Sequence, residues 1–138
     1  MEPIFKTIIP PVTKTAPLQA TTPSIGMFFS KLFVYRNKLH FAHLSTNSYA
    51  EHKALNEAYD AMLPLMDTLM ESVQGIYGIQ KIKEVPCDDY PSTVALLEKM
   101  YSCIDEYRFL FKESWIQSSL DLFQELFAST LYKLKFLK

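Results

Sequence analysis

Apolar side chains recur at steps of three and four residues after Ser24, which is the spacing of an amphipathic helix. The first such segment, residues 24–44, starts at a serine that can cap a helix. The second, residues 49–73, stops before Gly75 and contains Pro64. Because a proline removes one backbone hydrogen bond, we expect the second helix to bend there. The apolar positions of the first segment are Phe28, Leu32, Tyr35, Leu39 and Ala42.

Two further helices are predicted in the second half of the chain. One starts at Ser92, and the other starts at Ser114, where Ser114 and Gln117 form the S-x-x-Q pattern of a capping box. Short links make the first two helices antiparallel, and likewise the last two. The connection over residues 75–91 is long enough for a crossover. The sequence therefore predicts an all-α fold, a four-helix bundle over residues 24–138.

The N-terminal segment, residues 1–23, has a different composition. It holds five of the eight prolines and five threonines, so neither a helix nor a sheet interior can persist there. It also carries more apolar side chains than a solvated linker normally does. We predict an extended arm that lies against the protein's own body or against another protein chain. The apolar residues of this arm are Ile4, Phe5, Ile8, Ile9, Val12 and Leu18.

Composition and charge exclude several classes of function. With 14 basic and 15 acidic residues, the chain has no basic surplus to attract nucleic acid. No stretch approaches the ~20 apolar residues of a membrane span. The spacing of Cys87 and Cys103 matches neither a thiolate metal site nor a disulfide scaffold. We therefore expect a soluble cytoplasmic protein of one domain, with two reduced cysteines.

The three histidines, His40, His43 and His52, all lie within the stretch LHFAHLSTNSYAEH. At about 100° per residue, His52 shares one polar stripe of the second helix with four other possible ligands. His52 and Glu71 are nineteen residues apart, roughly 28 Å along a straight helix, so they cannot share a metal within one chain. Two antiparallel copies of this helix would bring them together. The other three ligands in the stripe are Asn56, Asp60 and Asp67.

His40, His52, Asp67 and Glu71 are separated by twelve, fifteen and four residues. In this spacing the chain resembles the ferroxidase segment of the Dps-like ferritins, the DNA-binding proteins from starved cells. The stretch LHFAHLSTNSYAEHKALNEAYDAMLPLMDTLMESV is similar to that family's first corner and second helix. YPSTVALLEKMYSCIDEY is similar to the start of its third helix, and the last 25 residues to its fourth. The resemblance covers residues 24–138 and would allow a phage-encoded member.

The resemblance implies a ferritin-like bundle with a long crossover and an iron site shared between two copies. His40 and His52 of one copy would face Asp67 and Glu71 of its two-fold mate, inside a hollow dodecamer. These four residues would form the ferroxidase centre that oxidises Fe(II) to Fe(III) for storage as mineral, protecting against oxidative damage. Imidazole and carboxylate groups are suitable ligands for iron, and another divalent metal is an alternative.

The chain departs from the family pattern at Asn56, where the family usually has an aspartate. An amide is a weaker, neutral ligand, and Asp60 one turn later could partly replace the missing charge. His43 matches nothing in the pattern and is interpreted as a packed polar residue. Asp67 and Glu71 alone would be typical of a solvated helix face, so only the complete set of donors predicts a metal site.

A structural role is the alternative hypothesis. The bundle would then keep a vestigial site without metal, and the arm of residues 1–23 would attach it to a larger assembly such as a virion. The arm and Asn56 favour this interpretation, whereas the four spaced donors favour iron oxidation.

Overall fold

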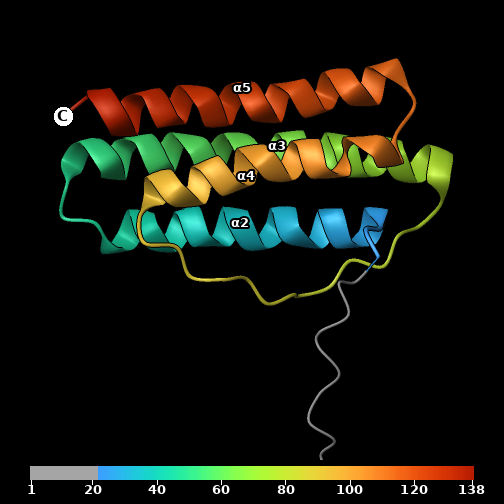
Figure 1. Ribbon diagram of the computed structural model, residues 1–138, viewed down its shortest axis with the longest axis horizontal. Coiled ribbons are helices and arrows are strands. Elements are labelled where there is room, and N and C mark those ends of the chain that lie inside the picture. Colours follow the sequence, from blue (N-terminus) through green and yellow to red (C-terminus); the bar gives the residue numbers. More distant parts are fainter. Residues whose placement is uncertain (1–21) are drawn as a thin grey trace, which may run out of the picture.

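The structure, a computed structural model, describes residues 22–138, and within them the chain forms helices and no strand. The predicted arm therefore lies outside the described part, except for Thr22 and Pro23. The prediction of an all-α bundle is confirmed (Figure 1). The helices are α2 (Ile25–Ser45), α3 (Tyr49–Tyr77), α4 (Thr93–Tyr107), the 3-10 helix η1 (Arg108–Leu110) and α5 (Ser114–Phe136).

Serine side chains begin three of the four α-helices. Ser24 accepts a hydrogen bond from the backbone N–H of Met27 at 3.1 Å. Ser48 and Ser92 cap α3 and α4 in the same way. Each hydroxyl satisfies one of the backbone donors that a helix leaves unpaired at its start, which typically stabilises the helix by about 1 kcal/mol. The predicted starts of the first three helices are therefore confirmed.

The predicted capping box of α5 is wrong. Glu113 precedes the helix, and Ser114 is already its first residue. The side-chain amide of Gln117 donates to the carbonyl oxygens of Arg108 and Phe111, at 2.9 and 2.7 Å. It therefore satisfies carbonyl groups around η1 rather than the start of its own helix. The pattern S-x-x-Q was present, but the turn at η1 supplied better partners for the glutamine.

Pro64 lies inside helix α3, as predicted, but the helix is longer than predicted because it continues through Gly75 to Tyr77. Gly78 ends it with a φ of 87°, a backbone conformation that favours glycine. The backbone N–H of Gly78 still donates to the carbonyl oxygen of Gln74 at 2.9 Å. The extra turn moves the start of the crossover further along the bundle.

The connection between α3 and α4, residues 78–92, runs back along the outside of α2 (Figure 1). As a result α3 and α4 point in the same direction, while α2 and α3 are antiparallel, as are α4 and α5. Helix α3 packs against both α2 and α5, and α4 packs mainly against α5. The long crossover predicted from the sequence is therefore present.

A close contact holds the crossover to α2. The Ser30 hydroxyl donates to the carbonyl oxygen of Gly26 at 2.7 Å and accepts from the backbone N–H of Lys83 at 3.0 Å. Further along, the Lys38 ammonium pairs with the exposed Asp89 carboxylate at 3.1 Å. The crossover is thus fixed near both of its ends although it has no regular structure.

The core is formed by one stripe from each α-helix. Of the apolar positions predicted in α2, four are buried in the core and Ala42 is partly buried at its edge. Phe28 is fully buried and stacks on Tyr107 with 5.1 Å between ring centroids, so α2 and α4 meet there. Helices α3 and α5 supply most of the remaining core. The largest of their fully buried side chains are Leu55, Met62, Met66, Leu69, Phe123 and Phe127.

The corner between α2 and α3 is tied to the start of α4 by one carboxylate. Glu51 accepts hydrogen bonds from the hydroxyls of Thr46 at 3.0 Å and Thr93 at 2.7 Å. Because Glu51 also lies in the first turn of α3, its charge is favourable for the helix dipole. This contact fixes the backbone from which the histidines project.

Candidate functional site

His43 and His52 form a reciprocal contact across the corner between α2 and α3. Nδ1 of His43 lies 2.7 Å from the carbonyl oxygen of His52, and Nδ1 of His52 lies 2.8 Å from the carbonyl oxygen of His43. The two rings are stacked, with 3.7 Å between centroids and 19° between planes. Because a carbonyl oxygen only accepts, both Nδ1 atoms carry the proton. In each neutral ring, Nε2 therefore holds the free lone pair.

His40 lies beside this pair but makes a different contact. Its ring stacks on Tyr59 of α3, with 4.2 Å between centroids and 16° between planes. The Arg36 guanidinium lies 5.6 Å from the centroid of the same Tyr59 ring, and its Nε donates to the Tyr59 carbonyl oxygen at 3.1 Å. Tyr59 is therefore enclosed by two side chains of α2, which fixes the position of His40 relative to α3.

Asn56 and Asp60 belong to a chain of hydrogen bonds along α3. The Tyr59 hydroxyl donates to the side-chain oxygen of Asn56 at 2.7 Å, and the Asn56 amide donates to the Asp60 carboxylate at 3.3 Å. The Asn56 oxygen, which is the atom that would bind a metal, already accepts a hydrogen bond. The structure thus gives Asn56 a structural partner within its own chain.

Asp67 and Glu71 lie on the exposed side of α3, one turn apart. Neither carboxylate forms an ion pair or side-chain hydrogen bond with any residue between 22 and 138. At 1.5 Å per residue they are about 22 and 28 Å from His52 along the helix. Within one chain, His52 is therefore too far from these two carboxylates to share a metal ion with them.

The described part of one chain does not bring the six predicted ligands together. Among residues 22–138, no group of three or more His, Cys, Asp or Glu side chains lies close enough to hold a metal ion. The interpretation of His43 as a packed polar residue is confirmed, since the residue is buried, but its pairing with His52 was not predicted. The signal for this pairing was position, because His43 and His52 lie at similar distances on the two sides of the short loop, residues 46–48.

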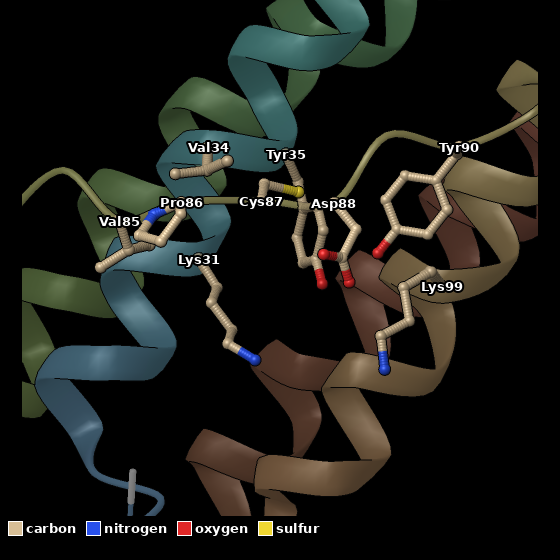
Figure 2. Close-up of a pocket in the computed structure, with 9 residues that line it drawn as sticks. All are labelled: Lys31, Val34, Tyr35, Val85, Pro86, Cys87, Asp88, Tyr90 and Lys99. Atoms are coloured by element: carbon tan, nitrogen blue, oxygen red, sulfur yellow. The ribbon is translucent and has the colours of Figure 1, made fainter. Parts of the chain in front are cut away.

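A second feature is a small pocket that the crossover closes over α2 and α4 (Figure 2). Its volume is about 210 Å³. Tyr35 lies at its base, and Figure 2 shows the two lysines Lys31 and Lys99 on either side of the tyrosine. The rest of its lining is Val34 of α2 together with Val85, Pro86, Cys87, Asp88 and Tyr90 of the crossover.

Burial changes the acid–base behaviour of the groups under this pocket. It raises the pKa of the Tyr35 hydroxyl far above its ordinary value, and the nearby Cys103 thiol raises it further. Burial likewise raises the pKa of Cys103 to about 11. Cys87, on the crossover, also has a raised pKa because of burial. Both cysteines are therefore protonated thiols near neutral pH, which makes them poor nucleophiles.

We expect the protein to lose stability above about pH 9, where an unfolded cysteine loses its proton. Tyr35 and Cys103 are neutral when protonated. Because their pKa values are raised in the folded protein, these two side chains lose their protons at a lower pH in the unfolded chain than in the folded one. Cys103 alone should lower the free energy of unfolding by about 1–2 kcal/mol at pH 10 relative to pH 8. Urea denaturation at the two pH values measures the loss.

Two variants separate this effect from general alkaline denaturation. Tyr35→Phe removes one of the two buried acids and should make the free energy of unfolding less dependent on pH. Tyr101→Phe makes the same chemical change at an exposed tyrosine of α4 and is the matched control. Equal pH dependence in all three proteins would contradict the role of the buried groups.

The helices of the structure bear on membrane insertion, and three comparisons with known proteins bear on identity. Over residues 22–138, each helix is too short or too polar to cross a lipid bilayer. A family model described as a family of unknown function, DUF5856, matches residues 43–134. The match includes His52, Asp67 and Glu71 and begins after His40. No curated protein and no solved structure matches the chain.

Proposed function

Because the chain belongs to the family of unknown function DUF5856, whose description names no activity, we propose its function from the arrangement of the donors. The chain pairs with a second copy and binds Fe(II) as a substrate for oxidation, as its resemblance to the Dps-like ferritins implies. The observation that carries this proposal is the position of the donors on α3. His52 lies near one end, Asp67 and Glu71 lie beyond the middle, and the two carboxylates have no partner among residues 22–138.

The nitrogen donor has the second interaction that metal-binding histidines usually make. Such a histidine normally donates its other ring N–H to a carbonyl or carboxylate oxygen, which fixes the orientation of the ring. His52 donates Nδ1–H to the His43 carbonyl oxygen, so Nε2 is the nitrogen available to iron. His40 is held against Tyr59 and would add a second imidazole from the same chain.

An antiparallel pair of α3 helices would complete the site. Isologous contact places His52 of each copy opposite Asp67 and Glu71 of the other, so a dimer has two sites. The midpoint between these donors falls near residue 61, where the exposed Leu63 offers an apolar contact. Phe33, His40 and Leu44 recur at seven and four residues and therefore share one side of α2. Phe33 and Leu44 are both exposed there, which supports self-association through the α2–α3 face.

The proposed reaction is a one-electron oxidation of each iron. Two Fe(II) ions supply the two electrons that break the O–O bond of one hydrogen peroxide molecule. The two oxygens take up two protons in addition to their own and leave as two water molecules, while both ions become Fe(III). The chain's part is to hold iron with imidazole and carboxylate groups and leave a position open to the oxidant.

We predict that the purified protein is at least a dimer and binds Fe(II) without oxygen, then oxidises it on addition of peroxide. Asp67→Asn should remove most of this activity, because it replaces a charged ligand by a neutral amide of the same shape. Glu125→Gln neutralises an exposed carboxylate on α5 and is the matched control. Light scattering, an Fe(II) titration and ferric absorbance give the three measurements.

Mixing two inactive variants tests whether the site is shared between copies. In a mixed dimer of His52→Ala and Asp67→Asn chains, one site loses both ligands and the other keeps both. Random exchange should therefore restore about a quarter of the sites. No recovery after exchange of the copies, or full activity in either variant alone, would show that the site is not the proposed one.

A structural role is the second candidate, and Asn56 is the observation that favours it. Its side-chain amide is hydrogen-bonded to Tyr59 and Asp60. The position that usually carries an aspartate in the Dps-like ferritins therefore stabilises the helix surface in this chain. A protein that neither binds Fe(II) nor changes its assembly on Asp67→Asn would support this role in place of iron oxidation.

A further inference from the structure

His43 and His52 exchange equivalent hydrogen bonds, but the two residues are buried to different extents. The His43 side chain is buried, with 8% of the residue exposed, whereas His52 is only partly buried. The His43 ring also meets the Tyr59 ring edge to face, with 5.3 Å between centroids. His43 is therefore the member of the pair that the core holds, and His52 is the member that solvent can reach.

Two separate parts of His43 act on His52. Its backbone carbonyl oxygen accepts the Nδ1–H of His52, and its ring covers one face of the His52 ring at 3.7 Å. In return, its Nδ1–H donates to the His52 carbonyl oxygen, which fixes the first turn of α3 beneath that ring. Together these contacts restrict the rotamer, the plane and the protonated nitrogen of His52.

We infer that His43 is a positioning residue, which holds His52 as an Nδ1–H imidazole with its Nε2 lone pair available to a ligand. This inference deepens the proposed function, on which the identity of the ligand as iron rests. A free neutral histidine in water favours the opposite form, with the proton on Nε2. The contact with His43 therefore keeps Nε2 of His52 unprotonated, as metal binding requires, even in the metal-free protein.

The test uses the full-length protein without metal and records the proton position by nitrogen-15 NMR of the histidine rings. His40→Gln and His52→Gln variants assign the signals to individual residues. In the native protein, we expect the neutral His52 ring to be almost entirely in the Nδ1–H form. In His43→Ala, the backbone carbonyl remains but the ring is lost, and we expect a mixture in which the Nε2–H form is substantial.

Two further variants separate the functions of the His43 ring. His43→Asn retains a donor at nearly the position of Nδ1 but loses the stacked ring, while His43→Phe retains an aromatic ring but loses the donor. Each should give a proton distribution between those of the native protein and His43→Ala. Circular dichroism at the same temperature shows whether the variants remain helical, and a variant that unfolds is compared at a lower temperature.

An unchanged Nδ1–H form of His52 in folded His43→Ala would overturn the inference, and so would a native His52 that carries its proton mainly on Nε2. Iron binding is then measured separately by anaerobic Fe(II) titration. We expect the affinity to fall 10- to 100-fold in His43→Ala, about the effect of losing a group that orients a ligand. Native protein that fails to bind Fe(II) while His43 still controls the His52 proton refutes the proposed iron function and leaves the positioning role intact.

Discussion

Replacement of Phe28 by alanine should lower the free energy of unfolding by about 3–5 kcal/mol, the usual range for a fully buried phenylalanine. Phe28 has no exposed surface, and its ring contacts three others. It stacks on Tyr107 at 5.1 Å and lies 6.1 Å from both Phe29 and Phe111, measured between centroids. The substitution opens a cavity where α2, α4 and the turn after η1 meet, and these backbones cannot easily move to fill it. Urea denaturation measures the loss.

Phe109→Ala is the matched control for this prediction. Phe109 lies in η1, close in sequence to Phe111, but 70% of its surface is exposed. Removal of an exposed ring leaves no cavity and should change the free energy of unfolding by less than about 1 kcal/mol. Similar losses in the two variants would mean that the packing around Phe28 is not as described.

The arrangement of helices could be predicted from the sequence because each signal was local. Apolar spacing identified the stripes that now form the core, and serines marked the starts of α2 and α4. The ends were less predictable. Gly75 looked like a terminator, but a helix tolerates glycine at a modest cost, and the helix ends where Gly78 adopts a positive φ. The capping box predicted from Ser114 and Gln117 was wrong because the hydrogen-bond partners of Gln117 lie around η1, and sequence spacing does not show them.

The candidate site was only partly predictable, because most of its contacts join different helices. Residue spacing placed His52, Asp67 and Glu71 on one polar side of α3, and all three are at least partly exposed. The pairing of His43 with His52 could not be derived from periodicity, since it depends on how the loop of residues 46–48 turns the chain. The engagement of Asn56 by Tyr59 was also missed, because an asparagine on a polar stripe gives no sign of its partner.

The close approach of the crossover to α2 depends on the absence of a side chain at Gly26. A Cβ atom at this position would lie 2.5 Å from the backbone carbonyl oxygen of Lys81. Real Cβ contacts essentially never reach this distance, and the obstructing atom belongs to the backbone, so it cannot rotate away. Next to it, Ser30 joins Gly26 and Lys83 through two hydrogen bonds. The glycine and the serine therefore form one docking point for the crossover.

We expect Gly26→Ala to destabilise the protein by about 2–3 kcal/mol, because overpacking and the loss of a hydrogen bond outweigh the better helix propensity of alanine. Gly75→Ala makes the same chemical change within α3, where a Cβ atom meets nothing within 4 Å. That control should instead stabilise the protein, by up to about 1 kcal/mol. Hydrogen exchange should show faster exchange of the Lys83 amide in Gly26→Ala, because its bond to Ser30 is lost first. If both alanine variants are stabilised equally, the crossover does not depend on the space at Gly26, and its contact with α2 must be looser than the distances indicate.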